Sequence, residues 1–357
     1  MRLTIAVRLA TVAAALLACT GIGVAAPASA CACGGVASAR DETASVGNEI
    51  ALAAWDGRSE SILLQLAMHA DSGNAALIVP TPTPATVAAG SAETFAELRR
   101  STAPVVVTDR RWFGSGSSSD GAAVGSQATP GDGPTVLDQV RLGPLEATTL
   151  SGGELDGIRR WLSDNGYEMR PEVTATLEPY LREGWSFVAL RLTSDEPLNG
   201  TLDPVRLTFD SDRFVYPMRM SGAAKHPQSV RLYLLSNHRL QRTDADAGSQ
   251  SSSVGFAGRI TDIGDPALKQ LADNGHDYLT EFSISIAEPT AITTDFTFEA
   301  APTDHGYHRV IHRTEDVQIL GLPAGPILLG AAVLAAAGVI IAIARAIRPP
   351  AGPDSPR

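Results

Sequence analysis

The chain has 357 residues, of which 44% are hydrophobic, so it can bury a sizeable core in one large domain or in two. Its formal net charge is -11, and this acidic balance argues against binding nucleic acids, anionic lipid headgroups or teichoic polymers through charge. With 33 glycines, 23 prolines and few aromatic residues, the sequence predicts short elements joined by many turns.

Residues 1–30 are predicted to be a signal peptide. Two arginines precede an apolar run, and small residues ending at Ala30 offer a cleavage site that would make Cys31 the mature N-terminus. The alternative is a lipoprotein signal, in which Cys19 carries the lipid. Leu17 fits that signal poorly and the apolar run continues beyond Cys19, so ordinary cleavage is the preferred interpretation.

Export would place Cys31 and Cys33 in an oxidising compartment, where they are the only pair available for a disulfide. A disulfide across one intervening residue closes a small strained ring, which is readily reduced. A redox pair, a soft-metal site for copper or zinc, and a structural link are therefore all open. Because a CxC motif has no second cysteine cluster here, the structural link is preferred.

Residues 31–113 are predicted to be an N-terminal β-rich part. Apolar runs on both sides of Asp56-Gly57, a strong turn pair, predict a hairpin of Glu49–Trp55 and Ser61–Met68. The prolines from Pro80 onward predict an extended surface connection. The remaining expected elements are a strand over Ala75–Val79, a helix over Ala92–Arg100 with Phe95 and Leu98 inward, and a strand over Pro104–Thr108.

Residues 114–134 are rich in glycine and serine and are predicted to be a flexible loop. The loop does not match GxxxxGK[ST], and no strand-to-helix context surrounds it, so a phosphate-binding loop is not expected. Residues 135–318 are predicted to form a second part that holds a pair of helices and further strands, beginning with strand-like material at Val136–Leu150.

Glu154–Leu192 predicts the order helix, turn, helix, strand. Ser151 and Glu154 form a capping box at the start, and Asn165-Gly166 ends the first helix. Pro171 suits the first turn of the second helix, and Pro179 should bend or restart it. Gly184 then ends this helix, and Trp185–Leu192 predicts a half-buried strand.

The run from Trp161 to Leu192 contains WL-x-x-NGY, a spaced L-x-x-Y and then GWSFVALRL, and it resembles an uncharacterised family of exported bacterial proteins, domain of unknown function 2330. The resemblance covers most of the chain between the signal peptide and the C-terminal apolar segment, and it implies no activity. Three further stretches are similar to the same family, namely CACGG at Cys31–Gly35, LIVPTPTPATV at Leu77–Val87 and LDPVRLTFDSDRFVYPMRMS at Leu202–Ser221.

Beyond Leu192 the sequence predicts mostly strands. Asp244–Gly255 is expected to be a second polar loop and Pro266–Ala272 a short helix. Phe282, Ile284 and Ile286 alternate with serines, as in a half-buried strand. The expected strands are Val205–Phe209, Phe214–Met218, Val230–Leu235, Tyr278–Ile286 and Ile292–Phe298.

His305, His308 and His312 have spacings of three and four that one helical face could present to zinc. Gly306 and the β-branched Val310-Ile311 disfavour a helix, and a strand would separate His305 from the other two. The preferred interpretation is solvated residues in a membrane-proximal stalk. GxSxG and HExxH are absent from the sequence, so no catalytic residue and no cofactor is predicted.

The C-terminal part predicts a transmembrane helix within residues 319–347. Ile319–Ala344 carries no charge over 26 positions, whereas about 20 apolar residues suffice to cross a bilayer core. Arginines follow the span, so residues 348–357 are expected to be a cytoplasmic tail with the bulk of the chain outside. The external part, residues 31–318, carries 23 basic and 38 acidic residues.

Together these features predict an α+β extracytoplasmic domain rich in antiparallel strands, with a helical pair packed on the sheet and one C-terminal membrane anchor. The first functional hypothesis is a non-catalytic module that binds a protein or cell-wall partner or supports an envelope complex. The second is an enzyme, either a thiol-disulfide protein using Cys31 and Cys33 or a hydrolase with a dispersed site. The third is metal capture by Cys31 and Cys33 with His305 or His308.

Overall fold

The computed structural model describes residues 34–39, 42, 44–112, 135–142, 145–151, 155–168, 170–194, 196–224, 226–319 and 322–347. Within these ranges the chain is strand-rich, its sheets are mostly antiparallel, and five α-helices are present, which agrees with an α+β protein. The chain divides into two units. The first unit comprises Met1–Ser101 with Gly125–Gly306, and the second comprises Thr102–Val124 with Tyr307–Arg357.

The first unit contains an antiparallel five-stranded sheet. Four of its five strands lie in segments that were predicted to be strands, and the central strand is β9. In order across the sheet, the strands are β1 (Gly35–Ser38), β4 (Asn74–Thr81), β9 (Ser186–Thr193), β8 (Leu145–Ser151) and β7 (Thr135–Leu142).

Gly34, just before the edge strand β1, lies where a side chain would not fit. A Cβ atom at Gly34 would lie 2.3 Å from the backbone oxygen of Ile78, closer than real Cβ contacts come. Gly35 then pairs with Ile78, which also pairs on its other side with Ala189 of β9. Gly34 of CACGG therefore allows the chain at the start of β1 to approach the strand that contains LIVPTP.

A larger sheet in the same unit is built around the long hairpin of β2 and β3. Trp55 pairs with Glu60 across the Asp56-Gly57 turn, so the predicted hairpin is confirmed. β13 and β2 run parallel, and the other pairs in this sheet are antiparallel. The strand order is β15 (Ser251–Arg259), β16 (Tyr278–Ile286), β13 (Gln228–Ser236), β2 (Ala44–Trp55), β3 (Ser59–Ala70), β11 (Val205–Asp210) and β5 (Thr86–Ala89), with β10 (Asn199–Thr201) also on β3.

A small third sheet completes the strands of this unit, and short 3₁₀ segments join its parts. The sheet has the order β12 (Phe214–Tyr216), β17 (Phe296–Ala300) and β14 (Leu240–Arg242). The 3₁₀ segments are η2 (Arg219–Ala223), η3 (Asp273–Gly275) and η4 (Pro289–Ala291).

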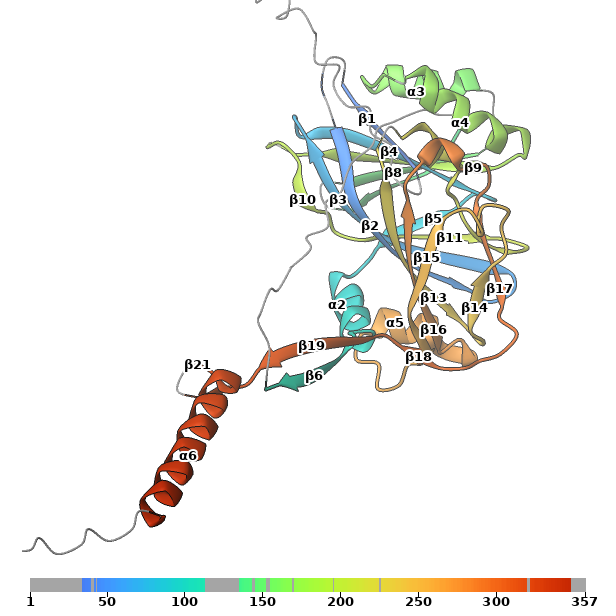
Figure 1. Cartoon of the computed structure of the whole chain (residues 1–357). Coiled ribbons are helices and arrows are strands. Elements are labelled where there is room, and N and C mark those ends of the chain that lie inside the picture. Colours follow the sequence, from blue (N-terminus) through green and yellow to red (C-terminus); the bar gives the residue numbers. More distant parts are fainter. Residues whose placement is uncertain are drawn as a thin grey trace, which may run out of the picture. The chain divides into compact units, whose positions relative to one another are not determined.

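The central strands are buried on both faces. In β9, Val188 and Leu190 enter the largest apolar cluster, which also contains residues of β2 and β3, whereas Phe187 and Ala189 enter a second cluster. That second cluster holds residues of α3 (Leu155–Asp164) and α4 (Pro171–Arg182). The prediction that β9 is half-buried is therefore wrong, because its outer face is also covered (Figure 1).

The larger sheet also has a second covered face. Leu52 and Leu63 point into a third cluster, which contains Phe95 and Leu98 of α2 (Ala92–Ser101) and Leu268 of α5 (Pro266–Ala272). The predicted inward positions of Phe95 and Leu98 are confirmed by their complete burial.

Glycine and proline set the helix ends largely as predicted. Gly166 and Gly184 have φ values of +82° and +75°, which favour glycine and stop α3 and α4. Pro171 occupies the first turn of α4. Of the two outcomes expected at Pro179, a bend or a restart, the restart is wrong, because α4 continues to Arg182. The missing N–H removes one hydrogen bond close to the helix end, where neighbouring apolar side chains are already buried.

The strands expected beyond Leu192 are confirmed except at three places. The strand expected over Phe214–Met218 ends at Tyr216. Ser251–Gly255, the last part of the expected polar loop, belongs to β15, whose first three residues are exposed serines without the apolar alternation that indicates a strand. The last expected strand begins at Phe296 and not at Ile292, because η4 occupies Pro289–Ala291 just before Ile292. The capping residue Glu154 and the Gly/Ser-rich segment 114–134 lie outside the described residues.

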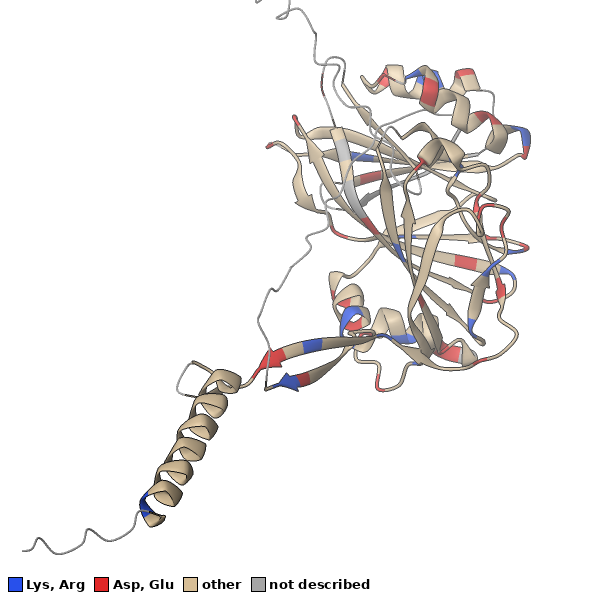
Figure 2. Cartoon of the chain, in the orientation of Figure 1, with Lys and Arg blue, Asp and Glu red and all other residues tan. Residues whose placement is uncertain are grey.

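The second unit contains a parallel pair of strands and a long apolar helix. β6 (Val105–Arg111) runs parallel to β19 (Val310–Asp316). Helix α6 (Ala324–Ala346) contains an 18-residue window with a mean hydropathy of 2.8 and carries no charge before Arg345 (Figure 2). Of the helices described, it alone is long and apolar enough to cross a membrane. The short strands here are β18 (Tyr307–His308), β20 (Gln318–Ile319) and β21 (Leu322–Pro323).

One buried carboxyl group in the hairpin lacks a full set of partners. Glu60 on β3 is completely buried; its Oε2 accepts a hydrogen bond from the Val215 backbone N–H at 3.2 Å, and its Oε1 has no partner. Burial raises the pKa of the Glu60 carboxyl well above its ordinary value of 4.5. Burial therefore favours the protonated form of Glu60 in the folded protein.

Glu60→Gln is expected to flatten the pH dependence of stability. The stabilising contribution of protonated Glu60 is fully present below pH 4.5 and is lost as the pH rises through the raised folded-state pKa. In that window the wild-type free energy of unfolding should fall relative to the variant by up to about 1.4 kcal/mol per pH unit. Urea denaturation from about pH 5 to about pH 8 measures the difference.

The matched control is Glu299→Gln, an exposed change on β17, which should leave the pH dependence as in the wild type. If the curves for the wild type and Glu60→Gln run parallel across the same pH range, the protonated state assigned to Glu60 is wrong.

Candidate functional site

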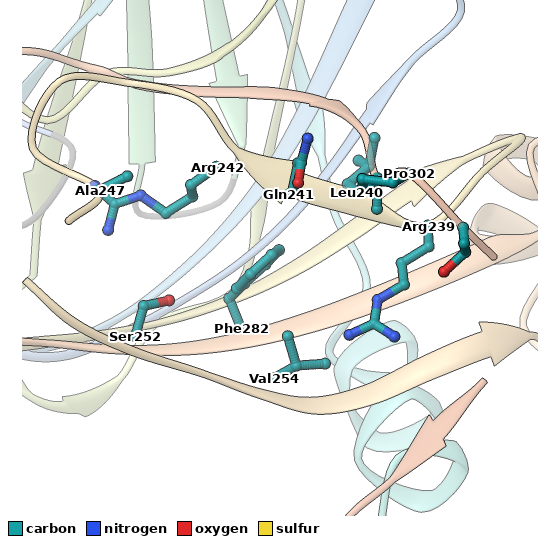
Figure 3. A pocket seen from close by; sticks show the side chains of 11 residues that line it. Arg239, Leu240, Gln241, Arg242, Ala247, Ser252, Val254, Phe282 and Pro302 are labelled. Atoms are coloured by element: carbon teal, nitrogen blue, oxygen red, sulfur yellow. The ribbon is translucent and has the colours of Figure 1, made fainter. Parts of the chain in front are cut away.

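A pocket of about 470 Å³ opens between β14, β15, β16 and the segment that follows β17. Its apolar lining is formed by Leu240, Val254 and Phe282. Arginine side chains lie on two sides of Phe282, as Figure 3 shows. The pocket therefore combines an apolar floor with positively charged walls, and we call it the arginine pocket. Its main polar side chains belong to Arg239, Arg242 and Ser252.

Arg242, the last residue of β14, is almost completely enclosed. Its Nε and Nη2 donate to the Asp244 carboxylate at 2.9 and 2.6 Å. Its guanidinium carbon lies 3.8 Å from the centroid of the Phe296 ring, a favourable cation–π distance. The side chain is only 3% exposed, and its buried Nη1 has no hydrogen-bond partner. Arg242 is thus rigidly held, yet one donor group remains unused.

Arg239 is fixed by the loop after β17. Its Nη1 donates to the backbone oxygen of His305 at 2.8 Å, and its backbone N–H donates to Asp304 at 2.8 Å. His238 also contacts the Asp304 carboxylate at 2.8 Å. These contacts from His238 and Arg239 lower the pKa of Asp304. Together these contacts hold His238 and Arg239 against the segment that follows β17.

A second pocket of about 350 Å³ lies on the other side of the Arg242–Asp244 pair, since Asp244 lines it. The main cationic side chain of this pocket is that of Arg219, which binds two carboxylates. Its Nε donates to Asp295 at 2.8 Å, and both of its terminal nitrogens donate to Glu183. Its guanidinium carbon also lies 4.1 Å from the Tyr180 ring centroid. Every nitrogen of this guanidinium therefore has a protein acceptor.

Asp295 is the acceptor at the centre of this second pocket. It receives hydrogen bonds from the Tyr180 hydroxyl, from the Met218 backbone N–H at 2.7 Å and from the Arg219 backbone N–H at 3.0 Å. Burial and the negative Asp295 raise the pKa of Tyr180 well above its usual value, and hydrogen bonds from Arg219 lower the pKa of Glu183. The network joins α4, η2 and the start of β17, which is a structural role.

The family-like stretches meet in this network. Tyr180 and Trp185 come from the Trp161–Leu192 run, and Arg219 comes from the Leu202–Ser221 run. The rings of Tyr180 and Trp185 lie 4.9 Å apart, and the Arg219 guanidinium is within 5.6 Å of Trp185. The prediction that these aromatic residues serve packing agrees with their burial.

The site residues proposed from the sequence are not brought together in the described part of the chain. Cys31, Cys33 and the alternative lipidation site Cys19 lie outside the described residues. His305 belongs to the first unit and contributes its backbone oxygen to Arg239. His308 and His312 belong to the second unit, where His308 Nε2 donates to the Ala103 oxygen at 2.7 Å and His312 contacts Asp109 at 2.8 Å.

The helical alternative for the three histidines is wrong, because Tyr307–His308 and Val310–Asp316 are strands. Within the described ranges, no group of three or more His, Cys, Asp or Glu side chains is arranged to hold a metal ion. The arginine pocket was not predicted. Arg239 and Arg242 are two of 26 arginines, and no sequence pattern marks the residues near 301–303 as their neighbours.

A family model described as an uncharacterized protein conserved in bacteria, DUF2330, matches residues 27–299. No curated protein matches the sequence. Two solved structures of a mutated baculovirus P35 after caspase cleavage show a loose likeness. The 3.1 Å structure is 8% identical, with a TM-score of 0.32 over 67% of this chain and 97% of the other. The 2.7 Å structure is 7% identical, with a TM-score of 0.30 over 70% and 99%.

Asp295→Ala is expected to lower the free energy of unfolding by about 3 kcal/mol, because it removes the acceptor of the Arg219 guanidinium and of two backbone N–H groups. Tyr180→Phe removes the hydroxyl that donates to Asp295 and accepts from the Arg219 backbone N–H, which also reaches Asp295, and should cost about 1 kcal/mol. Chemical denaturation measures both changes. Asp212→Ala, an exposed change in the turn before β12, serves as the control. A loss for Asp295→Ala as small as that of the control would contradict the network.

Proposed function

The chain belongs to the DUF2330 family of uncharacterized bacterial proteins, and from its own residues we propose that it is a membrane-anchored extracytoplasmic binding module without catalytic activity. The observation that carries the proposal is one long apolar helix, α6, in a chain whose first unit is a folded domain with an arginine-lined pocket. The membrane would be the first partner, and a protein or cell-wall component the second.

Charge asymmetry supports the orientation in this proposal. Residues 31–318 carry 38 acidic residues, whereas three arginines, Arg345, Arg348 and Arg357, follow the apolar core of the helix. Basic residues flanking a membrane helix favour the cytoplasmic side. The N-terminal segment up to Ala30 has the composition of an export signal. Both ends of the chain thus favour a cytoplasmic C-terminus with the strand-rich unit outside.

The helices α3 and α4 are included in the proposal as one packed pair that covers the five-stranded sheet. Ile158 of α3 and Leu177 of α4 share an apolar cluster with Phe187 of β9, which supports this arrangement. In the proposed module the pair closes one face of the domain. The pocket, which is lined by residues 239–303, is built from other elements.

Binding is favoured over catalysis by the way the polar groups are used. At the second pocket, Arg219, Asp295 and Glu183 satisfy one another. At the arginine pocket, the guanidinium groups of Arg239 and Arg242 are donors held in place by hydrogen bonds to His305 and Asp244. Fixed donors over an apolar floor are the usual composition of a ligand site. A purified protein that turns over a substrate, and loses that activity through one side-chain change, would contradict the proposal.

Thiol labelling tests the orientation. In a Cys31→Ser, Cys33→Ser background, Arg58→Cys in the exposed β2–β3 turn should react with a membrane-impermeant maleimide in intact spheroplasts. Ser355→Cys in the C-terminal tail should react only after the membrane is opened. Each variant serves as the control for the other, and labelling in the reverse order would show that the orientation is wrong.

Intact mass of the membrane-extracted protein tests the N-terminus. We expect a chain that begins at Cys31, with a mass shift after reduction and alkylation that corresponds to two thiols from one disulfide. Alkylation without reductant is the control for free thiols. A lipid adduct on Cys19 would replace ordinary cleavage by lipoprotein processing, and free thiols with bound metal would favour the metal alternative.

A further inference from the structure

Arg242 has one unused donor group, Nη1. Its side chain is 3% exposed, and its Nη1 is buried without a partner, while Nε and Nη2 are committed to Asp244. An unpaired buried N–H group carries a desolvation cost, which an incoming acceptor would relieve. Because the donor belongs to a guanidinium, a negatively charged oxygen is the best acceptor.

The other lining residues of the pocket indicate which chemical groups a ligand would have besides its acidic group. Leu240, Val254 and Phe282 supply an apolar floor, and the volume of about 470 Å³ fits a small organic molecule or a terminal residue of a peptide. Arg239 lies across the Phe282 ring from Arg242, as Figure 3 shows. A ligand with an apolar body and an acidic group would use both features of the pocket.

The charge balance favours a single negative charge. Asp244 is bound to Arg242 and offsets its charge, so Arg239 supplies the remaining positive charge of the lining. The formal net charge of -11 further disfavours multiply charged anions. A carboxylate, with one charge, fits this balance better than a phosphate dianion.

The second pocket does not offer the same chemistry. Its guanidinium, that of Arg219, already gives its Nε to Asp295 and its terminal nitrogens to Glu183. A ligand there would have to displace these carboxylates. The two pockets thus share the Arg242–Asp244 pair but differ in whether a donor is available.

We infer that the arginine pocket binds the carboxylate of an apolar organic anion, with Arg242 Nη1 as its donor and Phe282, Val254 and Leu240 against the apolar body, while Arg239 adds positive charge from across the Phe282 ring. The inference rests on the proposed binding function and gives its ligand a chemical class. The carboxylate can come from a free organic acid or from a peptide C-terminus, and these two sources share the same recognition chemistry.

Calorimetric titration of the full-length protein in detergent tests the inference. The probes are N-acetylphenylalanine, its neutral amide, the tripeptide acetyl-Ala-Ala-Phe with a free carboxylate, and inorganic phosphate. We expect N-acetylphenylalanine to bind at least about tenfold more tightly than the amide, because the amide lacks the charge that pairs with the guanidinium groups. Tripeptide binding at equal or greater affinity assigns the source to a peptide C-terminus, and weaker tripeptide binding assigns it to a free acid.

Variants place the binding in the pocket. Arg242 also holds Asp244, so its replacement risks misfolding, and two other changes are used. Ser252→Asp puts a negative charge into the pocket from an exposed position on β15 and should abolish binding. Ser251→Asp is the matched control, because neighbouring strand residues point to opposite faces, and it should bind as the wild type does.

Arg239→Gln should weaken binding of N-acetylphenylalanine about tenfold or more, whereas Arg58→Gln in the β2–β3 turn, which does not line the pocket, should leave it unchanged. Three results would overturn the inference: equal affinity for the acid and the amide, binding of phosphate alone, or unchanged binding in Ser252→Asp. Failure to bind any of the four probes would also overturn it. None of these results alters the thiol-labelling test of anchoring and orientation, so failure of the site and failure of the proposed function remain distinguishable.

Discussion

Alternation of side chains between two apolar layers is the constraint on which the first unit depends. In β3, Ile62 and Leu64 enter the cluster between the sheets, while Leu63 between them enters the cluster with α2 and α5. In β9, Val188 and Phe187 are separated in the same way. A register slip of one residue would exchange these sets between layers of different shape, so pairing is fixed from both faces. The alternation thus determines which side chains enter which apolar layer.

The polar sites lie where these apolar layers meet the small third sheet. Phe214, Phe296 and Phe298 extend the main cluster into that sheet, and buried guanidinium groups stack at its margin. Arg242 lies over Phe296, and Arg219 lies over Tyr180. A buried guanidinium is stable only with a carboxylate partner, which Asp244 and Asp295 supply. Both pockets thus contain a guanidinium–carboxylate pair, and they differ in their apolar lining and in whether a donor remains unused.

Local signals in the sequence predicted much of the fold. Asp56-Gly57 predicted the hairpin, Gly166 and Gly184 predicted two helix ends, and an uncharged run predicted α6, since each depends on neighbouring residues alone. The two-sided burial of β9 was missed although WSFVALRL is nearly continuously apolar, which is typical of a strand covered on both faces. The polar start of β15 gave no periodic signal, because its serines are exposed.

The arginine pocket could not be predicted, because its parts become neighbours only through sheet pairing. Arg242 meets Phe298 in the register of β14 with β17, and Val254 meets Phe282 in that of β15 with β16. Because strands and a bidentate carboxylate contact fix these side chains before any ligand arrives, little conformational entropy remains to be lost on binding. An isolated donor in a flexible loop would lack this advantage. The strand pairing that makes the pocket unpredictable from sequence therefore also makes it rigid, and this rigidity favours a binding role.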